Sequence, residues 1–164
     1  MIEAKRQLVQ IWLTKAQHDL ASADVLSQSR LPLLDTAIYH CQQAAEKCVK
    51  AFLIYCDHEV ERVHDVEALI RSALPYEPEF ASYADDGRVL TPYAMVFRYP
   101  GFIVEPSEDQ FDQAYASAVE IYRFVLSRLP AEVHPLPILT EFEIDPDLEL
   151  IEESEPRQSA ETDG

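Results

Sequence analysis

The chain has 164 residues and a formal net charge of −17, with only three glycines. This length fits one domain with a substantial core and a tail. No run of about 18 apolar residues occurs, so we expect no membrane span. The first residues, MIEAKRQLVQIWL, carry early charges and no cleavage site typical of a secretion signal, so we expect a cytoplasmic protein. The negative charge repels nucleic acid at long range, and contact with RNA or a nucleotide would need a local basic cluster.

The acidic residues are concentrated at the C-terminal end. Residues 130–164 hold 11 acidic side chains and one basic side chain, Arg157. We therefore divide the chain into a domain of residues 1–130 and an acidic, proline-rich arm of residues 131–164, partly disordered from Glu152. Apolar residues between positions 136 and 151 indicate that the front of the arm lies on the domain or on a partner.

Two long helices are predicted in the first third of the chain. Apolar residues recur at helical spacing over residues 4–27 and again over residues 33–57, with an interruption around Pro32. A shorter helix is expected over residues 65–73, because Pro75 ends it.

The second half of the chain predicts at least one more helix. In residues 76–100, Gly87 and Pro92 would bend or split a helix. A final helix follows Ser107, a plausible N-cap with acidic residues in the first turn, and runs to Leu129. The fold class predicted from these patterns is all-α, a bundle of four or five helices.

Three cysteines, Cys41, Cys48 and Cys56, fall on the apolar face of the second long helix. Neighbours are about 10–12 Å apart along its axis, whereas a disulfide needs Cα atoms within about 7 Å. We interpret them as buried structural cysteines in a reducing compartment.

The opposite face of this helix carries a polar stripe within HCQQAAEKCVKAFL. It comprises His40, Gln43, Glu46, Lys47 and Lys50. Residues four positions apart in this stripe, Gln43 with Lys47 and Glu46 with Lys50, can interact and simply support a solvated helix. Alternatively the stripe is a binding surface, with Lys50 holding a phosphate as a point charge.

Three further residues allow both a structural and a functional interpretation. His64, before the capping residue Asp65, could titrate near neutral pH or contact a ligand. Arg98 lies in an apolar run and must reach solvent, pair with Glu46 or Asp65, or bind an anion. Tyr99 could stack on a nucleotide base or simply pack against neighbouring side chains.

Other polar residues carry no predicted chemistry. His18, Asp19 and His134 are interpreted as surface residues. No metal-binding constellation and no glycine-rich phosphate loop stand out.

Three motifs together resemble the HEPN family, the higher eukaryotes and prokaryotes nucleotide-binding domain. They are YHCQQAAEKCVKAFLI, HDVEALI and FRYPG, in this order, and the resemblance covers residues 8–129. It implies an up-down helical bundle, often a dimer, that associates with nucleotides, RNA or a minimal nucleotidyltransferase.

Many members of this family are metal-independent ribonucleases of toxin–antitoxin and defence systems. They use an arginine followed, after four to six residues, by a histidine. Here Arg98 is followed at those positions by Ile103, Val104 and Glu105, so the usual acid–base partner is missing. The resemblance therefore points to the non-nucleolytic branch, with no catalytic residue and no cofactor.

The favoured function is a nucleotide- or partner-binding module, the companion of a nucleotidyltransferase-like protein. We expect a homodimer, and a polar pocket in which the second long helix meets His64 and Arg98. The predicted ligand-binding residues are Gln43, Glu46, Lys47, Lys50, His64, Arg98 and Tyr99. One alternative is a HEPN-type ribonuclease that uses His64 or a second chain. The other is a structural dimerisation module.

Overall fold

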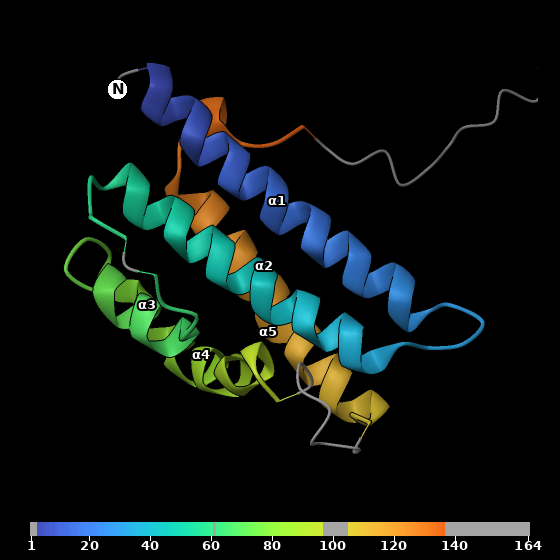
Figure 1. The fold of residues 1–164 in the computed structure, drawn as a ribbon. Coiled ribbons are helices and arrows are strands. Elements are labelled where there is room, and N and C mark those ends of the chain that lie inside the picture. Colours follow the sequence, from blue (N-terminus) through green and yellow to red (C-terminus); the bar gives the residue numbers. More distant parts are fainter. Residues whose placement is uncertain (1–2, 61, 97–104, 137–164) are drawn as a thin grey trace, which may run out of the picture.

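The computed structural model describes residues 3–60, 62–96 and 105–136. These residues contain five α-helices and three short 3₁₀ helices, so the predicted all-α bundle is confirmed (Figure 1). The α-helices are α1 (Glu3–Ser27), α2 (Leu34–Tyr55), α3 (Val66–Ala73), α4 (Ala84–Leu90) and α5 (Glu108–Arg128). The 3₁₀ helices are η1 (Pro78–Tyr83), η2 (Thr91–Ala94) and η3 (Ala131–Val133). Within the described ranges, no helix combines the length and apolar character needed to cross a membrane.

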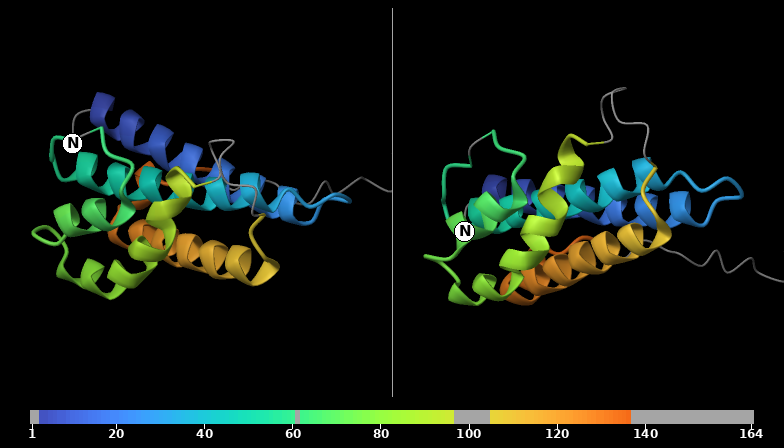
Figure 2. Two further views of the ribbon diagram at one scale, coloured as in Figure 1. Left: turned by 60° about the horizontal axis from the view of Figure 1, so that its bottom comes forward. Right: turned by 90° about the horizontal axis from the view of Figure 1, so that it is seen from below.

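Helix α2 lies at the centre of the bundle. It packs against α1 on one side and α5 on another, while α3 and α4 cover a third (Figures 1 and 2). Small side chains on α2, including Ala37, Ala44 and Ala45, are fully buried and allow its neighbours to approach closely. The central position explains why α2 buries residues over most of its circumference.

Two of the three cysteines are buried as the sequence predicts, whereas Cys56 is not. Cys41 and Cys48 are buried in the core, and all three thiols are free. Burial raises the pKa of Cys41 to about 12, so this thiol stays protonated and unreactive at neutral pH. Cys56 lies just past the end of α2, at its C-cap, and is half-buried.

Side-chain caps fix the starts of α3 and α5. The Asp65 carboxylate accepts a hydrogen bond from the Ala68 amide at 2.8 Å and so begins α3 one residue later than expected. Ser107 and Gln110 form a capping box at the start of α5. Both predicted caps are confirmed.

Gly87 does not bend or split a helix, contrary to the prediction. It lies inside α4, where an added Cβ would stand 2.8 Å from Ile70 Cδ1 and 3.0 Å from Glu67 Cα. The missing side chain instead lets α4 pack directly against α3. The interruption occurs later, where Thr91 begins η2 with Pro92 in its first turn.

The first residues of the arm pack onto the bundle. Val133 is fully buried, and the Gln10 side-chain amide donates a hydrogen bond to the His134 carbonyl at 3.2 Å. His134 Nε2 lies 3.0 Å from the carbonyl oxygens of Leu126 and Leu129. The prediction that His134 is a surface residue is therefore wrong, because its ring meets the carbonyl groups left open at the end of α5. Residues 137–164 lie outside the described ranges.

Candidate functional site

The polar stripe of α2 is largely buried, which corrects its interpretation as a solvated helix face. Glu46 and Lys50 are buried and the other three members of the stripe are half-buried, although the helical wheel places the stripe away from the cysteines; Gln42 next to it is buried as well. The reason is the central position of α2, since α1 and the segment leading into α3 cover this face from either side (Figure 1). Periodicity shows which residues share a face, but not how many neighbours that face has.

The buried side chains form a continuous hydrogen-bond network, here called the α2 network: Gln42, Gln43, Glu46, Lys50 and His64. Lys50 Nζ donates to Glu46 Oε1 at 2.7 Å. Gln42 Nε2 donates to Glu46 Oε2 at 3.0 Å and to the His64 carbonyl at 2.9 Å. Gln43 Nε2 donates to Gln42 Oε1 at 2.7 Å. The spacing of Gln42, Glu46 and Lys50 places them in one row along α2.

Glu46 is the centre of this network and is ionised within it. Burial alone would raise the pKa of Glu46, but hydrogen bonds from Lys50, Gln42 and His64, together with the Lys50 charge, lower it overall. A carboxylate that accepts several hydrogen bonds and faces a cation favours its charged form. The result is a neutral ion pair inside the protein.

His64 is the member of the network that reaches solvent. Its Nδ1 lies 3.2 Å from both Glu46 carboxylate oxygens, while 63% of its side chain is exposed. The following residue, Asp65, also accepts a hydrogen bond from Thr91 Oγ1 at 3.2 Å. The start of α3 is therefore fixed to both α2 and η2, and this holds the imidazole at the surface end of the buried pair.

A second polar cluster joins α1 to α2 beside the first. Asp19 is buried and accepts from Lys47, and its other oxygen lies 2.9 Å from His40 Nδ1. The interpretation of Asp19 as a surface residue is therefore wrong, because the α1–α2 contact covers it. Lys47 consequently pairs across helices rather than with Gln43. The Trp12 ring, whose centroid lies 5.9 Å from Lys50 Nζ, adjoins the α2 network from α1.

The predicted site residues thus divide into three groups. Gln43, Glu46, Lys50 and His64 come together in the α2 network. Lys47 belongs to the neighbouring Asp19 cluster. Arg98 and Tyr99 lie outside the described residues, and their part in a site stays a prediction.

Sequence reasoning missed Gln42 as a member of the network. Its four-residue spacing from Glu46 was the available signal, but its carbonyl partner at His64 depends on the tertiary fold. Asp19 was missed because nothing in the α1 sequence shows that Lys47 and His40 face it.

Two surface hollows formed by described residues include no member of this network. One is a shallow groove on α1, and another is formed by Asp57, His58, Glu59, Val60 and Tyr76. Over the described ranges, no group of three or more acidic, histidine or cysteine side chains is arranged to hold a metal ion. What the network offers is therefore hydrogen bonds and charge: an ionised carboxylate, an ammonium and an accessible imidazole.

These features define an all-α bundle whose central helix carries a buried glutamate–lysine pair linked to a histidine at the surface. The chain belongs to the HEPN domain family, which matches residues 9–129. The family match includes every residue of the α2 network and stops where the acidic arm begins.

Two solved structures have the same fold. TT1696 from Thermus thermophilus is 26% identical, with a TM-score of 0.62 over 75% of this chain and 99% of that chain. ST0689, described as an archaeal HEPN homologue, is also 26% identical, with a TM-score of 0.57 over 73% of this chain and 96% of that chain. No protein with curated annotation matches the sequence.

Proposed function

We propose that this protein is a non-catalytic nucleotide-binding module and that the α2 network is its binding site. The observation that carries the proposal is the buried Glu46–Lys50 pair with the exposed His64 ring hydrogen-bonded to it. In this proposal, the exposed His64 ring contacts a phosphate group, the Glu46–Lys50 pair holds that ring in place, and the Gln43 amide contacts the base or ribose.

The energetics of the buried pair support a functional role. Replacing a buried ion pair with well-packed apolar residues is often neutral or stabilising, because both charges must be desolvated. The core around this pair is otherwise largely apolar, with many buried alanine, leucine and valine side chains. Their burial supports selection for binding rather than for stability.

The local charge also supports this site. The chain is strongly acidic, so an anion must find a position where nearby carboxylates are already neutralised. Glu46 is paired with Lys50 and Asp19 with Lys47. The exposed His64 ring therefore lies beside a paired carboxylate and not beside a free one.

A nucleotide titration tests the proposal with a variant that removes both charges together. The double substitution Glu46→Gln with Lys50→Met avoids a lone buried charge and keeps the side-chain volumes similar. We expect wild type to bind a nucleoside triphosphate and the double variant to lose at least about tenfold in affinity, the equivalent of about 1.4 kcal/mol.

Lys5→Ala is the matched control, since Lys5 forms an exposed ion pair with Asp57 away from the network. It should bind like wild type. Absence of binding by wild type at millimolar nucleotide, or equal weakening in both variants, would refute the proposal and favour a purely structural dimerisation module.

A metal-independent ribonuclease is the second candidate, and the Glu46–His64 contact favours it. A carboxylate that holds one imidazole nitrogen orients the ring, as a general base for a ribose 2′-hydroxyl requires. Metal-free cleavage of single-stranded RNA that is abolished by His64→Ala, but not by His18→Ala on α1, would establish this activity. We expect no such cleavage, because the histidine that should follow Arg98 is missing.

The partner we propose is a nucleotidyltransferase-like protein, in a toxin–antitoxin-like arrangement, with the module acting as a homodimer. Co-expression with a nucleotidyltransferase encoded beside it should yield a complex that co-elutes on gel filtration. Light scattering at high micromolar concentration tests the dimer, and a strictly monomeric mass would contradict it.

A further inference from the structure

The outward face of α1 combines a groove, exposed apolar side chains and cations that lack an acidic partner among the described residues. The groove has a volume of about 680 Å³ and is lined by Gln10, Ile11, Thr14, Lys15, Gln17, His18 and Leu136. Ile11 and Val25 on this face are 57% and 68% exposed. This surface is distinct from the α2 network, which lies on the other side of the α1–α2 contact.

The chain itself enters this groove. Helix η3 and His134 pack on α1, and two residues later Leu136 lines the groove with 84% of its surface exposed. The arm therefore leaves the described structure from a position beside Ile11, between the ends of α1 (Figure 1). Any apolar residue that follows closely is delivered to this face at high effective concentration.

The sequence beyond Leu136 is suited to such a face. In EFEID, residues 141–145, apolar and acidic residues alternate, so an extended chain presents Phe142 and Ile144 on one side and acids on the other. Ile11 and Val25 are about 21 Å apart along α1 at 1.5 Å per residue. The eight residue-to-residue steps from Leu136 to Ile144 span up to about 26 Å when the chain is extended, so Ile144 can reach Val25.

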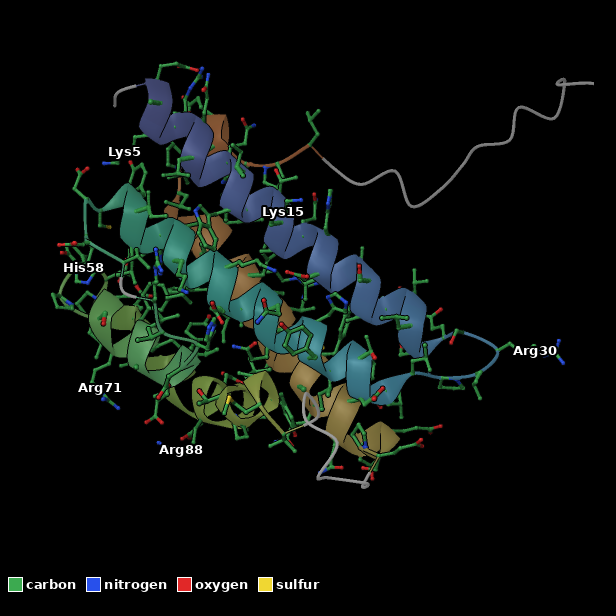
Figure 3. All side chains as sticks on the ribbon, viewed as in Figure 1. Lys5, Lys15, Arg30, His58, Arg71 and Arg88 are labelled. Carbon is green, nitrogen blue, oxygen red and sulfur yellow. The ribbon has the colours of Figure 1, made fainter. Side chains whose placement is uncertain are left out.

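The charges along the route are complementary. Eight of the eleven lysine and arginine side chains in the described residues have a carboxylate within 4.0 Å. The three others are Lys15, Arg30 and Arg62. Figure 3 shows Lys15 on α1 and Arg30 at the tip of the loop that follows α1. Two of these three cations thus lie on α1 or in the loop that follows it, while the arm beyond Leu136 carries a strongly negative charge.

We propose that residues 138–147 of this chain dock along the outward face of α1. Ile138, Phe142 and Ile144 cover Ile11 and Val25, while acidic residues of the segment meet Lys15 and Arg30. The chain's own arm is favoured over a second copy of the protein, because its attachment beside the groove gives it a high effective concentration there. The docked segment shields α1 and leaves the α2 network open to its ligand.

Disulfide trapping in the full-length protein tests the docking. In a Cys56→Ser background, Val25→Cys is combined with Ile144→Cys. The control combines Ile144→Cys with Glu120→Cys, an exposed position on α5. Glu120 lies about 12 Å along the helix from Arg128 and is therefore also within reach of a free arm.

At low micromolar protein under mild oxidation, we expect the Val25 pair to form an intramolecular disulfide at least about tenfold faster than the control pair. Adding Phe142→Asp should reduce its rate to that of the control. Equal rates for the two pairs would overturn the proposal, since a freely moving arm samples both positions. A disulfide formed mainly between molecules would also overturn it and assign the α1 face to a second copy.

Discussion

Two lysine-bearing surfaces of this molecule differ in how their charges are satisfied. Lys50 on α2 is buried and hydrogen-bonded to Glu46, whereas Lys15 on α1 is exposed and has no carboxylate partner among the described residues. Both lysines lie on the polar side of an amphipathic helix. The difference arises because α2 is central and α1 is peripheral, so equivalent sequence patterns have different energetic consequences. Lysine-to-alanine substitutions on the two surfaces make this comparison testable.

The largest effect is expected for Lys50→Ala. Removing the ammonium leaves the Glu46 carboxylate buried without its cation, and breaking a buried pair in this way costs about 3–5 kcal/mol. Urea denaturation should show this loss in the free energy of unfolding. The double variant Glu46→Gln with Lys50→Met should lose much less, because no lone charge remains. Equal losses would contradict this explanation, because the double variant leaves no lone buried charge.

A smaller but still large effect is expected for Gly87→Ala in α4. The added methyl group would overlap Ile70 Cδ1 and press on the α3 backbone at Glu67. Overpacking of this kind costs about 1–3 kcal/mol, although alanine is the better helix former. Thermal unfolding measures the change, and Ala84→Gly in the same helix is a control for propensity alone. A Gly87→Ala variant that is more stable than wild type would show that α3 and α4 can move apart without loss of stability.

The pH dependence of stability should report the Glu46 carboxylate. Its pKa is lowered in the folded protein, so its contribution is fully present above the unfolded value of about 4.3. The contribution is lost as pH falls through the folded pKa, because protons then bind Glu46 and break its pairing with Lys50. The free energy of unfolding of wild type should therefore fall more steeply with decreasing pH below about 4.3 than that of the Glu46→Gln, Lys50→Met variant. If the free energies of unfolding of the two proteins fell equally with decreasing pH, the assignment of this effect to Glu46 would be contradicted.

The smallest effect is expected for Lys15→Ala. An exposed lysine that lacks a partner in the described structure should change the free energy of unfolding by less than about 0.5 kcal/mol. Urea denaturation beside Lys50→Ala provides the direct comparison. A loss comparable to that of Lys50→Ala would show that the α1 face is buried in the intact protein.

The helices could be predicted from sequence because their signals are local. Each signal depends on residues within a few positions of one another: the helical spacing of apolar residues in α1, α2 and α5, and the caps at Asp65 and Ser107. Burial of the α2 stripe could not be predicted in the same way, because it depends on the segment before α3 crossing this face. Asp19 was misassigned for the same reason, since its partners Lys47 and His40 are 28 and 21 residues away.

The candidate site was accessible from sequence only in part. Glu46 and Lys50 were grouped by their helical spacing, and the expected polar pocket added His64; the structure brings these three together. The exact contacts, such as Gln42 to the His64 carbonyl, follow from tertiary packing. The role of Gly87 likewise became clear only when α3 and α4 were seen in contact.

The central claim, that the α2 network binds a nucleotide through His64, is tested most directly by NMR of the histidine ring signals during titration with a nucleoside triphosphate. The account predicts a saturable shift of the His64 signals and none of His18, an exposed histidine on α1. The His64 shift should vanish in the Glu46→Gln, Lys50→Met variant while its melting curve remains cooperative. No change at His64 at millimolar nucleotide, or equal shifts at His64 and His18, would contradict the claim.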